Sequence, residues 1–193
     1  MNKTEPIKSE KELMKFKGYY KEVEPNARNY LMIVLGMNTA LRISDILNLT
    51  WNKVYDFKNK KYKKYLIITE KKTGKNSQIY INSSIKEALT EYSRSDETVF
   101  KAEQYLFTAK GKNTPISRTQ AHRIIKKIVQ YYNIEECISC HSLRKTFGYF
   151  AWKQGTLPAL LVLLFNHSSY EITKCYLGID QDDKDEVYKT IKL

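Results

Sequence analysis

The spacing of apolar residues changes period twice along the chain, and this pattern most constrains the fold. Helical spacing marks three early stretches, at residues 8–22, 25–37 and 43–47, and returns after residue 82. Between them stand three short runs rich in β-branched and aromatic residues, at 54–57, 65–69 and 78–81. The sequence therefore predicts a mainly α-helical α+β protein with a small three-stranded antiparallel sheet.

The chain is strongly basic, which favours a polyanionic partner. Its 33 Lys and Arg residues exceed its 21 Asp and Glu residues and give a net charge of +12. Such an excess is typical of nucleic-acid binding, although anionic membranes attract the same charge. The longest apolar run, at residues 159–165, is far shorter than the roughly 20 residues that span a bilayer. We therefore expect no membrane segment.

Length and cysteine content limit the organisation and the compartment. A chain of 193 residues fits one domain with its own core, and no composition shift marks a linker. Three cysteines, an odd number without a leader segment before them, indicate a reducing compartment rather than a disulfide scaffold. We expect a cytoplasmic protein.

Two histidines, an arginine and a tyrosine stand at restrictive spacings in the last third of the chain. His141 and Arg144 are three residues apart, so on a helix they share one face. Gly148 falls on the same face, where we expect it to let a polyanion approach the backbone. His167 and Tyr176, nine residues apart, complete the group.

The geometry of the last pair depends on a short helix. Ser168 and Glu171 have capping-box spacing, so a helix is expected to start at Ser169 and end near Leu177, with Gly178 as its C-terminal cap. Over nine residues a helix rises about 13 Å, which separates His167 from Tyr176. Because helical side chains lean toward the N-terminus, we expect the Tyr176 phenol to point back toward His167.

Further charged candidates lie upstream. Arg42 stands at the start of a predicted helix, and Asp45 follows three residues later on the same face, where we expect it to orient the arginine. Lys72 lies in the turn between the second and third predicted strands. Lys71 and Lys75 flank it, and these three lysines remain alternatives for the mobile cation of that turn.

A competing motif overlaps the first histidine. Residues 137–141 read C-x-x-C-H, the attachment signature of a c-type haem. A haem would explain neither Arg42, Arg144 nor Tyr176, and attachment needs an exported chain. A zinc site would need a second ligand pair at finger-like spacing, which the sequence lacks. We therefore expect no cofactor and no metal.

The order and the local sequences of these motifs resemble those of the catalytic domain of the tyrosine recombinases, the phage and transposon integrases. The resemblance is carried by ALRISDILNL, EKKTGK, HSLRKTFGYF and NHSSYEITKCYL, and it spans nearly the whole chain. It implies that residues 1–193 form a single catalytic domain with an acidic tail at 179–193, and that the usual N-terminal core-binding domain is absent. Asn166 stands where glycine usually precedes the histidine, so we expect a shifted backbone at His167.

The resemblance also implies an activity, which is site-specific DNA recombination or integration through a 3′-phosphotyrosyl intermediate. The implied catalytic residues are Arg42, Lys72, His141, Arg144, His167 and Tyr176, with Asp45 in support. The tyrosine attacks the scissile phosphate, the arginines hold its oxygens and the lysine protonates the leaving 5′-oxygen. The first histidine accepts the tyrosine proton or assists the reverse step, and the second hydrogen-bonds the phosphate. No metal or cofactor takes part.

Double-stranded DNA is the implied partner, bound by a homo-tetramer on paired sites, with accessory DNA-bending proteins as further candidates. Two other functions remain open: relaxation of DNA like a type IB topoisomerase, and non-catalytic DNA binding by the same fold. The acidic tail carries a short apolar stripe of Val187, Tyr188 and Ile191. It is either a frayed or self-packed terminal helix or a segment that docks on a neighbouring subunit.

Overall fold

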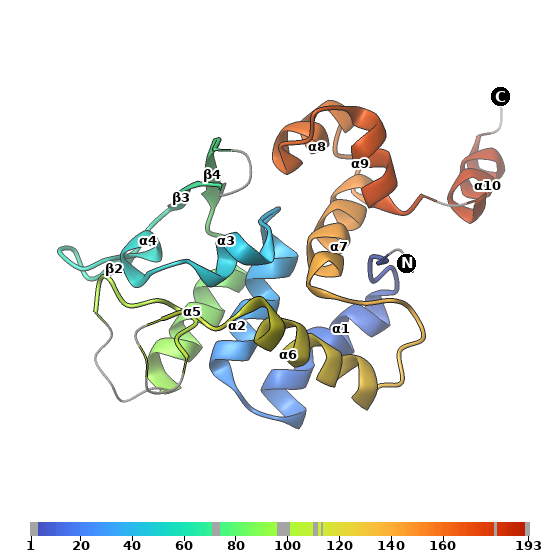
Figure 1. The fold of residues 1–193 in the computed structure, drawn as a ribbon. Coiled ribbons are helices and arrows are strands. Elements are labelled where there is room, and N and C mark those ends of the chain that lie inside the picture. Colours follow the sequence, from blue (N-terminus) through green and yellow to red (C-terminus); the bar gives the residue numbers. More distant parts are fainter. Residues whose placement is uncertain are drawn as a thin grey trace.

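The computed structural model describes residues 4–70, 74–95, 101–109, 112, 114–179 and 181–191 (Figure 1). The helices are α1 (Glu10–Gly18), the π-helix η1 (Tyr19–Val23), α2 (Ala27–Asn38), α3 (Ile43–Leu47), α4 (Trp51–Val54), α5 (Ser83–Ser95), α6 (Arg118–Tyr131), α7 (Cys140–Lys153), α8 (Pro158–Phe165), α9 (Tyr170–Leu177) and α10 (Gln181–Thr190). The strands are β1 (Tyr55–Asp56), β2 (Lys61–Tyr62), β3 (Tyr65–Thr69) and β4 (Asn76–Tyr80). The prediction of a mainly helical protein with a small antiparallel sheet component is confirmed.

Local capping explains where several helices begin. The Ser9 side chain accepts a hydrogen bond from the backbone of α1, and Ser117 forms the predicted capping box with Gln120 at the start of α6. Arg42 has extended backbone angles and immediately precedes α3, as the sequence predicts. These caps fix the chain direction on both sides of the site described below.

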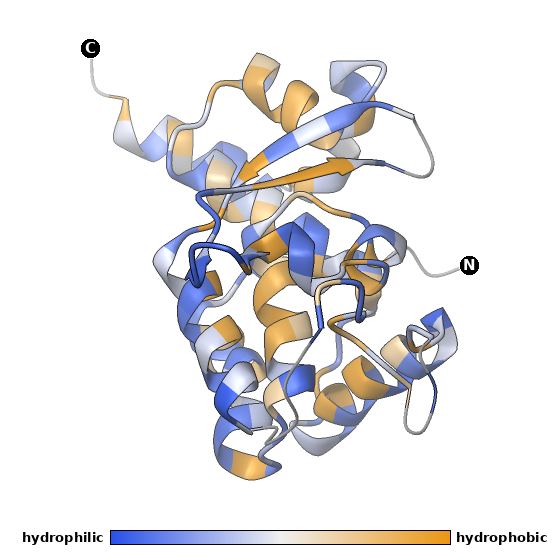
Figure 2. Cartoon of the chain, turned by 90° about the vertical axis from the view of Figure 1, so that its left-hand side faces the viewer, coloured by the Kyte–Doolittle hydropathy of each residue, from blue (hydrophilic) through white to orange (hydrophobic). Residues whose placement is uncertain are grey.

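Helix α2 forms the centre of the main core. Its residues from Tyr30 to Leu35 are all buried, and the helix packs against α5 and α7. In Figure 2 apolar colour runs through the central helices and also covers the helix at the top, α8. A Cβ atom added at Gly36 would lie 2.5 Å from the Leu143 side chain, so α2 and α7 approach closely at this point. This contact places the start of α7 beside the end of α2.

The sheet differs from the prediction. Among the described residues the strands form two separate two-stranded ladders, β1 with β2 and β3 with β4, instead of one three-stranded sheet. The reason is a tight turn after β1, in which the Asp56 carboxylate accepts hydrogen bonds from the backbone of Lys58 and Asn59. This turn pairs β1 with the lysine-rich segment Lys61–Tyr62, which the sequence pattern indicated only as a turn.

Helices α7, α8 and α9 enclose a second, smaller core, built on Leu161, Phe165 and Leu177. A Cβ at Gly148 would lie 2.5 Å from Cζ of Phe165 and 3.3 Å from Cδ2 of Leu177. The expectation that Gly148 admits a polyanion is therefore wrong. The glycine lets α8 and α9 pack directly on α7.

The acidic tail forms α10, which stands away from the rest of the fold in Figure 1. An ion pair of 3.0 Å between Lys153 and Asp183 connects it to α7. Val187, Tyr188 and Ile191 are 52%, 80% and 59% exposed, so the apolar stripe is not self-packed. No helix in the described part of the chain has the length and apolar character to cross a membrane.

The close packing at Gly148 gives a stability prediction. Replacing Gly148 by Ala forces its methyl group against two core side chains, so we expect a loss of about 1–3 kcal/mol in the free energy of unfolding. Urea denaturation measures this loss. Gly18→Ala is the matched control, because its added Cβ meets only the flexible Glu22 side chain at 3.4 Å. The control should be neutral or stabilising, and equal losses in both variants would contradict the packing argument.

Candidate active site

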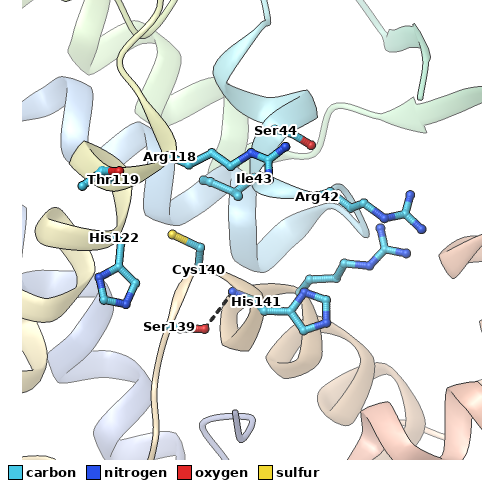
Figure 3. A pocket seen from close by; sticks show the side chains of 10 residues that line it. Arg42, Ile43, Ser44, Arg118, Thr119, His122, Ser139, Cys140 and His141 are labelled. Carbon is cyan, nitrogen blue, oxygen red and sulfur yellow. Dashed lines mark hydrogen bonds between the residues drawn. The ribbon is translucent and has the colours of Figure 1, made fainter. Parts of the chain in front are cut away.

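A pocket of about 620 Å³ opens between the start of α3, the first turns of α6 and the start of α7. Its lining residues are Arg42, Ile43, Ser44, Arg118, Thr119, His122, Ser139, Cys140, His141 and Arg144. Figure 3 shows Arg42 and His141 projecting toward the same space, with Arg118 and His122 contributed by α6. Three of the predicted catalytic residues therefore share this pocket with two basic residues that the sequence analysis did not select.

Arg42 is held by a carboxylate that the sequence analysis missed. Its Nη1 donates to Oε2 of Glu70 in an ion pair, and Glu70 is 2% exposed. Asp45, predicted to orient Arg42, is also buried, and its backbone N–H donates to the Arg42 carbonyl at 2.9 Å. The orienting role of the Asp45 side chain stays a prediction.

Arg144 is a buried cation, only 1% exposed. Its Nη1 donates to the Ala40 carbonyl and its Nη2 to the Phe165 carbonyl at 2.5 Å, which ties the end of α2 to the end of α8. Burial, together with the nearby charge of Arg42, lowers the pKa of Arg144 to about 10. The guanidinium therefore remains charged at neutral pH. Its Nε is buried and finds no hydrogen-bond partner among the described residues.

The two histidines and the tyrosine converge. The Tyr176 ring centroid lies 4.7 Å from that of His141 and 4.4 Å from that of His167, both edge to face. The Arg144 guanidinium carbon lies 6.0 Å from the Tyr176 ring centroid. Gly178 caps α9 as predicted, whereas the N-cap is Ser169, whose side chain accepts from the Ile172 N–H, instead of the predicted Ser168. The prediction that Tyr176 leans back toward His167 is thus confirmed.

His167 has an environment that favours its neutral form. Its ring stacks on Phe165 with a centroid distance of 5.1 Å, and its Nδ1 lies 3.0 Å from the Thr173 hydroxyl. Burial, followed by the charges of Arg144 and Arg42, lowers the pKa of His167 to about 4. His167 is therefore uncharged at neutral pH.

Asn166 adopts the left-handed conformation, with φ 49° and ψ 40°. Glycine favours the same region, so Asn166 and a glycine at this position can have the same backbone conformation. The expected shift of the His167 backbone therefore does not follow from the presence of asparagine. Instead the Asn166 side-chain amide donates to the Glu70 carboxylate and to the Ser77 hydroxyl, the latter at 3.2 Å.

The candidate mobile lysine cannot be placed. Lys72 and Lys71 lie outside the described residues, whereas Lys75 is described and exposed at the start of the returning strand. Glu70 and Lys75 close the base of this turn by a backbone hydrogen bond of 2.9 Å. The role of Lys72 therefore stays a prediction.

The cysteines near the pocket belong to no cluster of potential metal ligands in the described part of the chain. The described residues contain no group of three or more His, Cys, Asp and Glu side chains arranged to hold a metal ion. Burial raises the pKa of the Cys140 thiol to about 11. A protonated thiol is a poor metal ligand and a poor nucleophile. The residues of the site thus resemble a cationic anion-binding pocket beside a phenol.

The missed residues had weak signals in the sequence. Arg118 and His122 follow the recognised capping box at positions of the first and second turns of α6, so their common direction could have been found. Glu70 offered no comparable signal, because its partners Arg42 and Asn166 are 28 and 96 residues away along the chain.

Structural comparisons find solved proteins with the same fold. The fold matches XerA recombinase with a TM-score of 0.79 and 17% identity, over 100% of this chain and 66% of that chain. It matches XerH recombinase bound to a palindromic difH substrate with a TM-score of 0.76 and 20% identity, over 94% and 51% of the two chains. At such identities the likeness concerns the fold alone.

Sequence comparisons give the family. The chain is 39% identical over 189 residues to the probable integrase/recombinase YoeC of Bacillus subtilis, covering 98% of this chain and 97% of YoeC. It is 29% identical to a tyrosine recombinase of Pseudothermotoga lettingae, of which it covers 55%. Residues 8–182 match the phage integrase family. The chain therefore belongs to the phage integrase family, which confirms its resemblance to the tyrosine recombinases.

Proposed function

We propose that the protein catalyses site-specific DNA recombination by cutting and rejoining strands through a 3′-phosphotyrosyl intermediate. The observation that carries this proposal is the convergence of Tyr176 with two imidazoles next to the buried Arg144. A phenol beside two imidazole rings and fixed cations suits attack on a phosphodiester. Such chemistry depends mainly on positioning and on stabilisation of charge.

Each residue has a defined part in the proposed reaction. The Tyr176 oxygen forms a bond to phosphorus while the bond to the 5′-oxygen breaks, and His141 accepts the phenolic proton. Arg42 and Arg144 stabilise the charge on the non-bridging oxygens. Lys72 protonates the leaving 5′-oxygen. A 5′-hydroxyl of a second strand then reverses these steps, so religation needs no external energy source.

His167 contributes to this proposal as a neutral group. With its pKa near 4, it cannot supply a positive charge at neutral pH. Its Nδ1 contacts Thr173, and this fixes the ring so that the other nitrogen is available to the phosphate. Positive charge in the site therefore comes from the arginines and the lysine.

Double-stranded DNA is the proposed partner. The net charge of +12 favours a polyanion, and one structural neighbour is XerH bound to its difH substrate. Another is a lambda integrase dimer bound to a core site. We include in the proposal a homo-tetramer on paired sites, accessory DNA-bending proteins and a cytoplasmic location. The exposed apolar stripe of α10 supports docking on a neighbouring subunit.

The alternatives are less well supported. The sequence relatives and the structural neighbours named above are all recombinases or integrases. This favours DNA recombination over relaxation of DNA by a type IB topoisomerase-like activity. A non-catalytic DNA-binding protein would have no use for a tyrosine held against two histidines. Recombination therefore explains more of the geometry than either alternative.

The nucleophile can be tested by covalent trapping. A library of duplexes, each nicked beside a randomised segment, is incubated with the protein, and protein-linked strands are recovered under denaturing conditions and sequenced. Cleavage next to a nick releases a short oligonucleotide, so the adduct accumulates. We expect adducts with the wild type and none with Tyr176→Phe, which lacks the attacking oxygen. Tyr170→Phe is the matched control and should react normally, because Tyr170 is 40% exposed in the first turn of α9. No wild-type adduct with any duplex would reject the proposal.

Arg144→Lys tests the role of guanidinium geometry. Lysine keeps the charge but cannot donate to two carbonyls and a phosphate in a planar arrangement. We expect adduct formation to slow by about 100-fold or more, with a much smaller loss of DNA affinity in an electrophoretic shift assay. Arg123→Lys, on the exposed face of α6, should change neither quantity strongly. Equal losses of cleavage and binding in Arg144→Lys would indicate a cation that only binds DNA.

The low pKa of His167 predicts a pH dependence of stability. Its pKa is about 4 in the folded protein and about 6.5 in an unfolded chain. Between these values the unfolded state binds the extra proton, so stability falls as pH falls from 7 toward 4. The His167→Gln variant cannot take up this proton. The wild type should therefore lose more stability than the variant between pH 7 and pH 5, as measured by urea denaturation; equal losses would contradict the neutral state.

A further inference from the structure

A buried carboxylate connects three parts of the site that are distant in sequence. Oε2 of Glu70 accepts from Arg42, while Oε1 accepts from the Ser77 hydroxyl at 2.9 Å and from the Asn166 amide. These partners belong to the start of α3, to β4 and to the residue that ends α8. Glu70 is therefore the point at which these three elements meet.

The backbone of Glu70 is equally constrained. Its N–H donates to the Lys75 carbonyl at 2.9 Å, and its carbonyl accepts from the Gly74 N–H at 2.9 Å. Glu70 thus forms one side of the base of the turn that contains Lys72. The same residue fixes this base through its backbone and holds Arg42 through its side chain.

The carboxylate is charged in spite of its burial. Burial raises the pKa of Glu70, but the hydrogen bonds from Ser77 and Asn166 and the charge of Arg42 outweigh this effect and hold the pKa below its ordinary value. A buried charge with directional hydrogen bonds fixes the positions of its partners more strictly than a solvated ion pair does.

We propose that Glu70 is a positioning residue for DNA cleavage, which fixes the Arg42 guanidinium and joins the β3–β4 turn to the residue before His167. This inference rests on the proposed function. The choice of Asn166 supports it, because its left-handed backbone would suit glycine equally well, whereas only the asparagine amide reaches Glu70. The Asn166 side chain therefore helps to hold the Glu70 carboxylate in position.

The proposal predicts opposite effects on binding and on reaction. A carboxylate beside Arg42 repels DNA phosphates, so removing its charge should leave DNA affinity unchanged or increase it. Loss of the ion pair that fixes Arg42 should slow cleavage, since misplacement of a reacting group by about 1 Å can cost on the order of 100-fold in rate. A residue that only maintains the fold would reduce both quantities.

The test uses Glu70→Gln and a nicked duplex that the wild type has selected in the trapping assay. Adduct formation is followed under single-turnover conditions with saturating protein, and affinity for the same duplex is measured by fluorescence anisotropy. We expect cleavage slower by at least about tenfold, with unchanged or tighter binding. Glu24→Gln is the matched control, because it also removes a carboxylate from an ion pair, with Lys127 at 2.6 Å, and should react at the wild-type rate.

Asn166→Gly is the second variant, in case Glu70→Gln does not fold. It keeps the left-handed backbone and removes one donor to Glu70, so cleavage should slow while affinity is retained. Wild-type cleavage rates in both variants, or parallel losses of affinity and rate, would overturn the role of Glu70. If the wild type itself forms no adduct, the proposed function is rejected. A reactive wild type with equally reactive variants rejects only the positioning role.

Discussion

The buried guanidinium of Arg144 is the interaction on which the arrangement of the site depends. It binds the carbonyl after α2 and the last carbonyl of α8, so it joins the main core to the smaller core of α7, α8 and α9. Taking a charge out of water is costly unless directional hydrogen bonds replace hydration. The carbonyls of Ala40 and Phe165 provide that replacement, and the Phe165 carbonyl, at the last position of α8, has no partner within its own helix. The same cation thus supports the fold and faces the pocket.

The smaller core makes the second contribution. Phe165 lies under the Arg144 guanidinium at 4.9 Å and stacks against His167, and Gly148 allows this ring to approach α7. The ring removes water from both groups, which lowers the pKa of each. Helix α9 then needs only its caps at Ser169 and Gly178 to direct Tyr176 toward these groups. The electrostatics of the site therefore follow from apolar packing beneath it.

Much of the fold and of the site could be predicted because the relevant signals are local. Capping residues, helical periodicity and the backward lean of helical side chains placed Arg42, His141 and Tyr176 on the correct elements. The strand pairing could not be predicted, since it depends on the turn after Asp56. Gly148 was misinterpreted because its neighbours Phe165 and Leu177 come from other helices. Glu70 was missed for the same reason.

The charges of the site also explain why its partner should be an anion. Arg42 lowers the pKa of Arg144, which means that each cation disfavours the charge of the other. Glu70 offsets part of this repulsion, but its carboxylate is shared among Arg42, Ser77 and Asn166. A phosphate between the two guanidiniums would reduce the remaining repulsion. The distribution of negative charge over the non-bridging oxygens differs between the transition state and the bound substrate. Cations fixed to match the distribution in the transition state therefore stabilise the transition state more than the bound substrate. Rigid attachment of both arginines to buried oxygens is the condition for this preference.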